Sequence, residues 1–111
     1  MSAAGFHLTP LGQSSALLEP SRSLDISRAE ELIEEVVRRL QARRANLVYY
    51  DLSDLALIDG VYYAWLNRLA AACKAINVRM VCISMQPTAA FALAGMTLLP
   101  PQFETALDLT G

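Results

Sequence analysis

The segment from Leu47 to Leu66, LVYYDLSDLALIDGVYYAWL, constrains the fold of this chain more than any other stretch. It begins with an apolar run that ends at Asp51, passes through a loop, and turns at Gly60 into an apolar helix. A near-continuous apolar run of this length is typical of a central strand covered on both faces of an α/β sheet. The segment therefore predicts polar groups and a positive helix-dipole end outside the carboxyl end of a strand, where α/β proteins usually build their sites.

The remaining elements follow from turn residues and from hydrophobic periodicity. In chain order we expect a hairpin of two short strands (6–9 and 15–18), a helix opened by a capping box (27–30), the central strand (46–51), a helix (61–76), a strand (78–84), a short helix (88–94) and a last strand or helix start (103–109). Strand and helix alternate after the hairpin, which predicts right-handed crossovers and parallel pairing. The antiparallel hairpin then makes the α/β sheet mixed.

The two long predicted helices differ in their polar faces. The first is amphipathic, and its charged face offers the i,i+4 pairs Glu34–Arg38 and Glu35–Arg39. The second, over 61–76, is apolar or small nearly all round. A helix of that kind is either buried on two sides or meets a partner, and the sequence leaves both interpretations open.

Composition excludes several classes of protein. The 111 residues are enough for a single domain over 1–111, and 54% are hydrophobic while only 18% are charged, which favours burial against partners or self-association. The net charge of −2 without a basic block argues against nucleic-acid binding.

No signal peptide and no membrane-spanning run is recognisable, so we expect a cytoplasmic protein without membrane insertion. Cys73 and Cys82 lie in apolar segments and are expected to be reduced, buried thiols. Met1 and the abrupt end at Gly111 suggest a minimal or C-terminally truncated domain.

The chain lacks the residue patterns that catalysis needs. The three aspartates of the 47–66 segment could bind Mg²⁺, but their spacing matches no EF-hand and fits ordinary caps and turns. Hydroxyl residues such as Ser53 and Thr88 have no neighbouring base, because His7 is the only histidine. Zinc would lack ligands for the same reason. We therefore expect no enzyme, no metal and no cofactor.

Residues 46–96 resemble a STAS domain, the fold of anti-sigma-factor antagonists. The family pattern is a strand ending in Asp-apolar-Ser, then two apolar residues and an Asp before a Ser or Thr that opens a helix, and later a turn ending in Pro. Asp51–Ser53, Leu57–Asp59 and Ser84–Pro87 match these parts in order and spacing. Within the family, the segment is most similar to the RsbS and RsbR-type proteins of the stressosome. The resemblance implies a mixed sheet of four to five strands with helices packed mainly on one side.

One position departs from the family pattern. Gly60 stands where the family carries the Ser or Thr that a partner-switching kinase phosphorylates. Glycine has no hydroxyl, so that switch cannot operate here, and Ser53 and Thr88 remain as alternative phosphate acceptors. The resemblance still implies a partner-binding surface around this position, comprising Asp54, Asp59, Gly60, Val61, Tyr62, Tyr63 and Thr88.

Three functions are compatible with this surface. The first is a non-catalytic regulator that binds a switch kinase, an anti-sigma factor or other STAS subunits, with homo-oligomers among the possible assemblies. The second is a cytoplasmic STAS subunit of a membrane transporter, such as a phospholipid ABC system. The third is a domain that binds a nucleotide or lipid, which is disfavoured because the sequence supplies no phosphate-binding Lys or Arg near Asp59.

Overall fold

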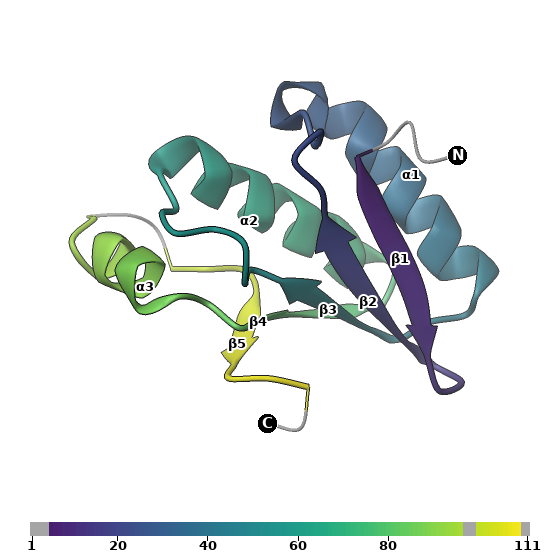
Figure 1. Cartoon of the computed structure of the whole chain (residues 1–111). Helices are drawn as coiled ribbons and strands as arrows, with labels where there is room; N and C mark the ends of the chain where they lie inside the picture. The colour runs from purple at the N-terminus through teal and green to yellow at the C-terminus, as the bar shows by residue number, and fades with distance from the viewer. Residues whose placement is uncertain (1–4, 97–99, 110–111) are drawn as a thin grey trace.

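The computed structural model describes residues 5–96 and 100–109 and shows an α/β fold around one five-stranded sheet (Figure 1). In chain order the elements are β1 (Phe6–Leu11), β2 (Ser15–Pro20), the 3₁₀ helix η1 (Ile26–Arg28), α1 (Ala29–Ala42), β3 (Leu47–Asp51), α2 (Gly60–Ala75), β4 (Arg79–Ile83), α3 (Pro87–Ala94) and β5 (Glu104–Ala106). The strands lie in the order β1-β2-β3-β4-β5, with β1 antiparallel to β2 and all other pairs parallel. The predicted mixed sheet is confirmed, and the last element is a strand. The stretch Leu98-Leu99-Pro100-Pro101 predicts a break in the chain before the last element, and it falls partly outside the described residues.

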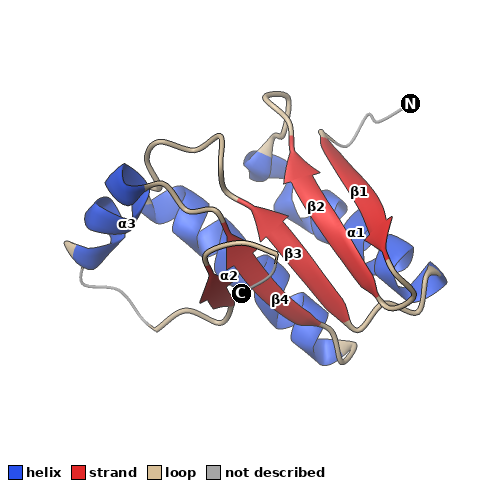
Figure 2. Cartoon of the chain, turned by 60° about the horizontal axis from the view of Figure 1, so that its bottom comes forward, coloured by secondary structure: helices blue, strands red, loops and turns tan. Residues whose placement is uncertain are grey.

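Helices α1 and α2 lie side by side against the same face of the sheet, and α3 lies at the end of the molecule toward which β3 points (Figure 2). The packing of helices mainly on one side is therefore confirmed. The prediction that the central strand is covered on both faces is wrong. Val48 and Tyr50 of β3 are buried beneath the helices, whereas Leu47 and Tyr49 point to the open face and are half-buried. Helices α1 and α2 lie on the opposite face, and these two side chains keep part of their surface exposed.

The core lies between the sheet and the two long helices. The two cysteines contribute to it as free thiols from α2 and β4, as expected. Burial raises the pKa of Cys73 to about 12 and that of Cys82 higher still, so neither is ionised near neutral pH. The largest fully buried side chains are Phe6, Leu18, Val36, Leu40, Val48, Tyr50, Leu52, Ile58, Leu66, Leu69, Cys73 and Cys82.

The start of the first helix differs from the capping box predicted at Ser27 and Glu30. Asp25 is the N-cap instead, and its Oδ1 accepts the backbone N–H of Ser27 at 3.1 Å and the Ser27 hydroxyl at 2.6 Å. This cap belongs to the 3₁₀ turn η1 that precedes α1. The prediction was wrong because Asp25, two residues upstream, takes the capping role and Ser27 lies inside the 3₁₀ turn.

Candidate functional site

The first turn of α2 is the centre of the candidate site. Asp59 caps the helix, and its Oδ1 accepts the backbone N–H of Tyr62 at 2.8 Å. Gly60 is the first helical residue, its φ is not in the left-handed region, and a Cβ placed there would have no neighbouring atom within 4 Å. Neither backbone strain nor crowding therefore requires glycine at this position. A side chain at residue 60 would project freely from the positive end of the helix.

The loop before α2 is held in place from both sides. At its start, the Asp51 carboxylate accepts the Ser53 N–H at 2.9 Å. From α3, Gln86 Nε2 donates to the Ser53 carbonyl at 2.6 Å and Thr88 Oγ1 donates to the Ala56 carbonyl at 2.5 Å. These bonds join the start of α3 to the loop that precedes Asp59. The Thr88 hydroxyl therefore supports this loop.

Three large apolar side chains are exposed at this end of the molecule. Leu57 is 63% exposed in the loop, Val61 is 68% exposed in the first turn of α2, and Phe91 is 83% exposed in α3, one turn after Thr88. We name Leu57, Asp59, Gly60 and Val61 the Gly60 surface. Phe91 lies on α3, whose start is joined to the same loop by the bond from Thr88. Neither Leu57 nor Phe91 is among the partner-binding residues predicted from the sequence. Leu57 belongs to the apolar pair of the family motif, but the sequence does not reveal that only Ile58 of this pair is buried.

Tyr62 and Tyr63 point to different environments. Tyr63 is 9% exposed and packs edge-on against Phe103, with ring centroids 6.0 Å apart and planes at 73°. Tyr62 is half-buried, and its hydroxyl lies 2.5 Å from that of Tyr50. The Trp65 indole donates to the same Tyr50 oxygen at 3.0 Å. Burial is the main cause that raises the pKa of both Tyr50 and Tyr62, so both hydroxyls keep their protons.

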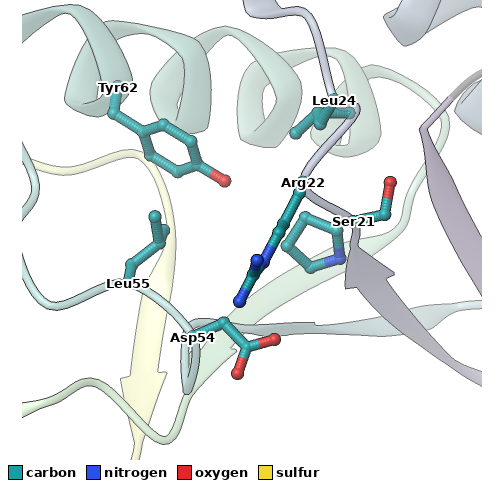
Figure 3. Close-up of a pocket in the computed structure, with 7 residues that line it drawn as sticks. Ser21, Arg22, Leu24, Asp54, Leu55 and Tyr62 are labelled. Atoms are coloured by element: carbon teal, nitrogen blue, oxygen red, sulfur yellow. The ribbon is translucent and has the colours of Figure 1, made fainter.

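A pocket of about 210 Å³ lies beside this hydroxyl network, at the carboxyl ends of β2 and β3 (Figure 3). Tyr62 from α2 and Asp54 from the loop after β3 line one part of it, and Arg22 lines another part from the loop after β2. Apolar walls complete the pocket. Its lining residues are Pro20, Ser21, Arg22, Leu24, Asp54, Leu55 and Tyr62.

Arg22 is the charged pocket residue that was not predicted from the sequence, which offers no cation near Asp59 along the chain. The structure places Arg22 in the same pocket as Tyr62, the residue whose N–H is capped by Asp59. The signal for it is topological, because parallel strands β2 and β3 bring the loops that follow them to the same sheet edge. No local sequence pattern around residue 22 predicts that Arg22 lines this pocket.

The aspartates of the 47–66 segment act as local caps or line the pocket. Within 5–96 and 100–109, no group of three or more His, Cys, Asp or Glu side chains could hold a metal ion. In the same described residues, no helix has the length and hydropathy needed to span a bilayer. Asp51 accepts the backbone N–H of Ser53, Asp59 caps α2, and Asp54 lines the pocket.

Comparison with known proteins agrees with this architecture. The STAS domain family model matches residues 11–108. Among solved structures, RsbS from Moorella thermoacetica with a serine-to-glutamate substitution superposes with a TM-score of 0.72 at 19% identity, over 95% of this chain and 88% of that chain. The NMR structure of the protein TM1081 superposes with a TM-score of 0.66 at 17% identity, over 80% of this chain and 70% of that chain. No curated protein matches the sequence. The family match covers nearly the whole described fold, and the chain therefore belongs to the STAS domain family.

Proposed function

We propose that this protein is a non-catalytic STAS regulator of partner-switching signalling that binds protein partners through the Gly60 surface. The partners are a switch kinase, an anti-sigma factor or other STAS proteins, including copies of itself, in the cytoplasm. The observation that carries the proposal is the open first turn of α2. Gly60 lies where the family carries its phosphorylated Ser or Thr, and the space around it would admit such a side chain.

The absence of a hydroxyl at residue 60 gives the proposed regulator a fixed state. A phosphate of about −2 charge at a helix N-terminus changes how a partner docks. Glycine cannot accept that phosphate, so the surface stays in its unmodified form and a partner backbone can approach closely. The exposed side chains of Leu57 and Val61 supply apolar contact area on either side of Gly60.

The phosphate-mimicking variant Gly60→Asp tests this proposal directly. A Cβ at residue 60 meets no neighbouring atom within 4 Å, and a carboxylate near a helix N-terminus is favourable, so the variant should fold as the wild type does. Its affinity for a partner captured by the wild-type chain should fall by about tenfold or more. Gly60→Ser without phosphorylation should bind as the wild type does.

The matched control is Ala71→Asp, which adds the same charge to an exposed position of the same helix. That position lies about 16 Å further along the helix axis, at a rise of about 1.5 Å per residue. Affinity capture from the native lysate, read by mass spectrometry, identifies the partner, and titration of that purified partner gives the affinities. Equal binding by Gly60→Asp and the wild type would place residue 60 outside the interface.

The same capture separates this proposal from the transporter interpretation. Recovery of a switch kinase, an anti-sigma factor or STAS proteins, lost in Gly60→Asp and kept in Ala71→Asp, would support partner switching. Recovery of transporter subunits would instead assign the chain to a transporter. Steady turnover of a substrate by the isolated chain would contradict a non-catalytic role.

A further inference from the structure

The hydroxyl of Tyr62 is a free donor at the pocket wall. Tyr50 is fully buried, and its oxygen has two hydrogen-bond partners among the described residues, the Trp65 indole at 3.0 Å and the Tyr62 hydroxyl at 2.5 Å. An indole N–H can only donate, so the proton of Tyr50 has only the Tyr62 oxygen as its acceptor. The Tyr62 hydroxyl then donates its proton to neither of the other two side chains.

This donor points into the pocket. The bonds run from Trp65 to Tyr50 to Tyr62, and each donated hydrogen bond polarises the next hydroxyl, which makes Tyr62 a stronger donor. Figure 3 shows the Tyr62 hydroxyl directed into the space between α2 and the loop that carries Arg22. In the part of the chain that the structure describes, Arg22 forms no ion pair. A guanidinium and a hydroxyl donor on one pocket are suited to a carboxylate.

The pocket also contains an acceptor and apolar walls. Asp54 lines the pocket near the tip of Arg22 and, like Arg22, has no ion-pair partner in 5–96 or 100–109. Its carboxylate can only accept hydrogen bonds at neutral pH, and an ammonium group is a suitable donor. Leu24 and Leu55 provide the apolar lining. The volume of about 210 Å³ is below the range of about 300–1,000 Å³ typical of sites for drug-sized ligands.

We propose that this pocket binds a free α-amino acid with an apolar side chain. The carboxylate is held by Arg22 and Tyr62, the ammonium group by Asp54, and the side chain lies against Leu24 and Leu55. The pocket volume favours a small ligand over a nucleotide, whose phosphates Asp54 would repel. This site is separate from the Gly60 surface, and the proposal does not depend on the function of that surface.

Calorimetric titration of the full chain tests the ligand class. The probes are L-valine, L-leucine, L-isoleucine, L-methionine and L-phenylalanine, each tested alone. For leucine the matched analogues are leucinamide, which lacks the carboxylate, and isocaproate, which lacks the ammonium group. At least one amino acid should bind, and removal of either charged group should weaken binding by about tenfold or more.

Pocket variants then assign the charged groups. Arg22→Gln and Tyr62→Phe should weaken amino-acid binding, while Asp54→Asn should remove the preference for leucine over isocaproate. Arg68→Gln, an exposed arginine of α2 outside the pocket, is the control and should bind as the wild type does. Circular dichroism verifies that each variant is folded. Failure of all five amino acids to bind, or equal binding by folded Arg22→Gln, would overturn the proposal.

Discussion

Helices α1 and α2 cover the same face of the sheet, but their outer surfaces differ (Figure 2). Each helix buries a leucine completely against the sheet, Leu40 in α1 and Leu66 in α2. The outer face of α1 is charged. Its Glu35 carboxylate accepts from Arg39 at 2.7 Å and also pairs with Arg38, which the sequence had paired with Glu34. This i,i+3 pairing places two arginines on one carboxylate.

The outer face of α2 combines small apolar residues with two exposed cations, Arg68 and Lys74. Ala64, Ala71 and Ala75 are exposed along it, and Val61 is exposed at its start. Of the two interpretations that the sequence left open, burial on two sides is wrong, because one side of α2 faces away from the sheet. Only the start of this face, where Val61 is exposed, belongs to the Gly60 surface that we propose a partner covers. Packing against the sheet accounts for the buried apolar residues of both helices. It does not account for the difference between their outer faces.

The largest expected effect tests whether the two buried stripes are equivalent. Leu66→Ala in α2 and Leu40→Ala in α1 should each lower the free energy of unfolding by about 2–5 kcal/mol, because both side chains are fully buried and each truncation leaves a cavity. Ala71→Ser on the outer face of α2 should change the unfolding free energy by less than about 0.5 kcal/mol. Urea denaturation measures all three. A large loss in Ala71→Ser would show that the outer face contributes to the stability of the isolated chain.

A smaller effect should distinguish the starts of the two helices. Asp59 caps α2 with a side-chain hydrogen bond, whereas Arg28, the N-cap residue of α1, makes no such bond. Asp59→Ala should therefore lower the free energy of unfolding by about 1 kcal/mol, within a range of about 0.5–2. Arg28→Ala should cost less than about 0.5 kcal/mol, because it removes only an exposed ion pair with Glu31. Thermal and urea unfolding of both variants would refute this order if Arg28→Ala proved the more damaging.

The order of elements could be predicted because its signals are local. The turn before Ser15 predicts the hairpin, the apolar spacing predicts α1 and α2, and Pro87 marks the first turn of α3. Local signals could not predict which face of the sheet is exposed to solvent. Leu47 and Tyr49 are as apolar as buried residues, and only the positions of the helices show that their face of β3 is open.

The candidate site was predictable only where a short motif specifies it. The motif locates Asp59 and Gly60 directly, and the structure places both in the first turn of α2. Arg22 and Phe91 could not be found in this way, because each comes from a segment distant in sequence. The neighbouring strands β2 and β3 bring Arg22 to the pocket, and the bond from Thr88 to the Ala56 carbonyl joins the start of the helix that carries Phe91 to the loop before Asp59.

The smallest expected effect concerns the charged outer face of α1. The hydrogen bond from Arg39 is the main cause that holds the pKa of Glu35 below its ordinary value of 4.5. A carboxylate whose pKa is lower in the folded state stabilises the fold above its unfolded pKa, and this stability is lost as the pH falls through the folded pKa. Because Glu35 is partly exposed, Glu35→Gln should reduce the unfolding free energy by only about 0.2–1 kcal/mol at pH 7. The difference from the wild type should shrink when urea denaturation is repeated below the folded pKa, and it should fall at high salt. A difference that stayed constant with pH would contradict an ionic contribution of Glu35 to the stability of α1, and the contrast with α2 would then not rest on charge.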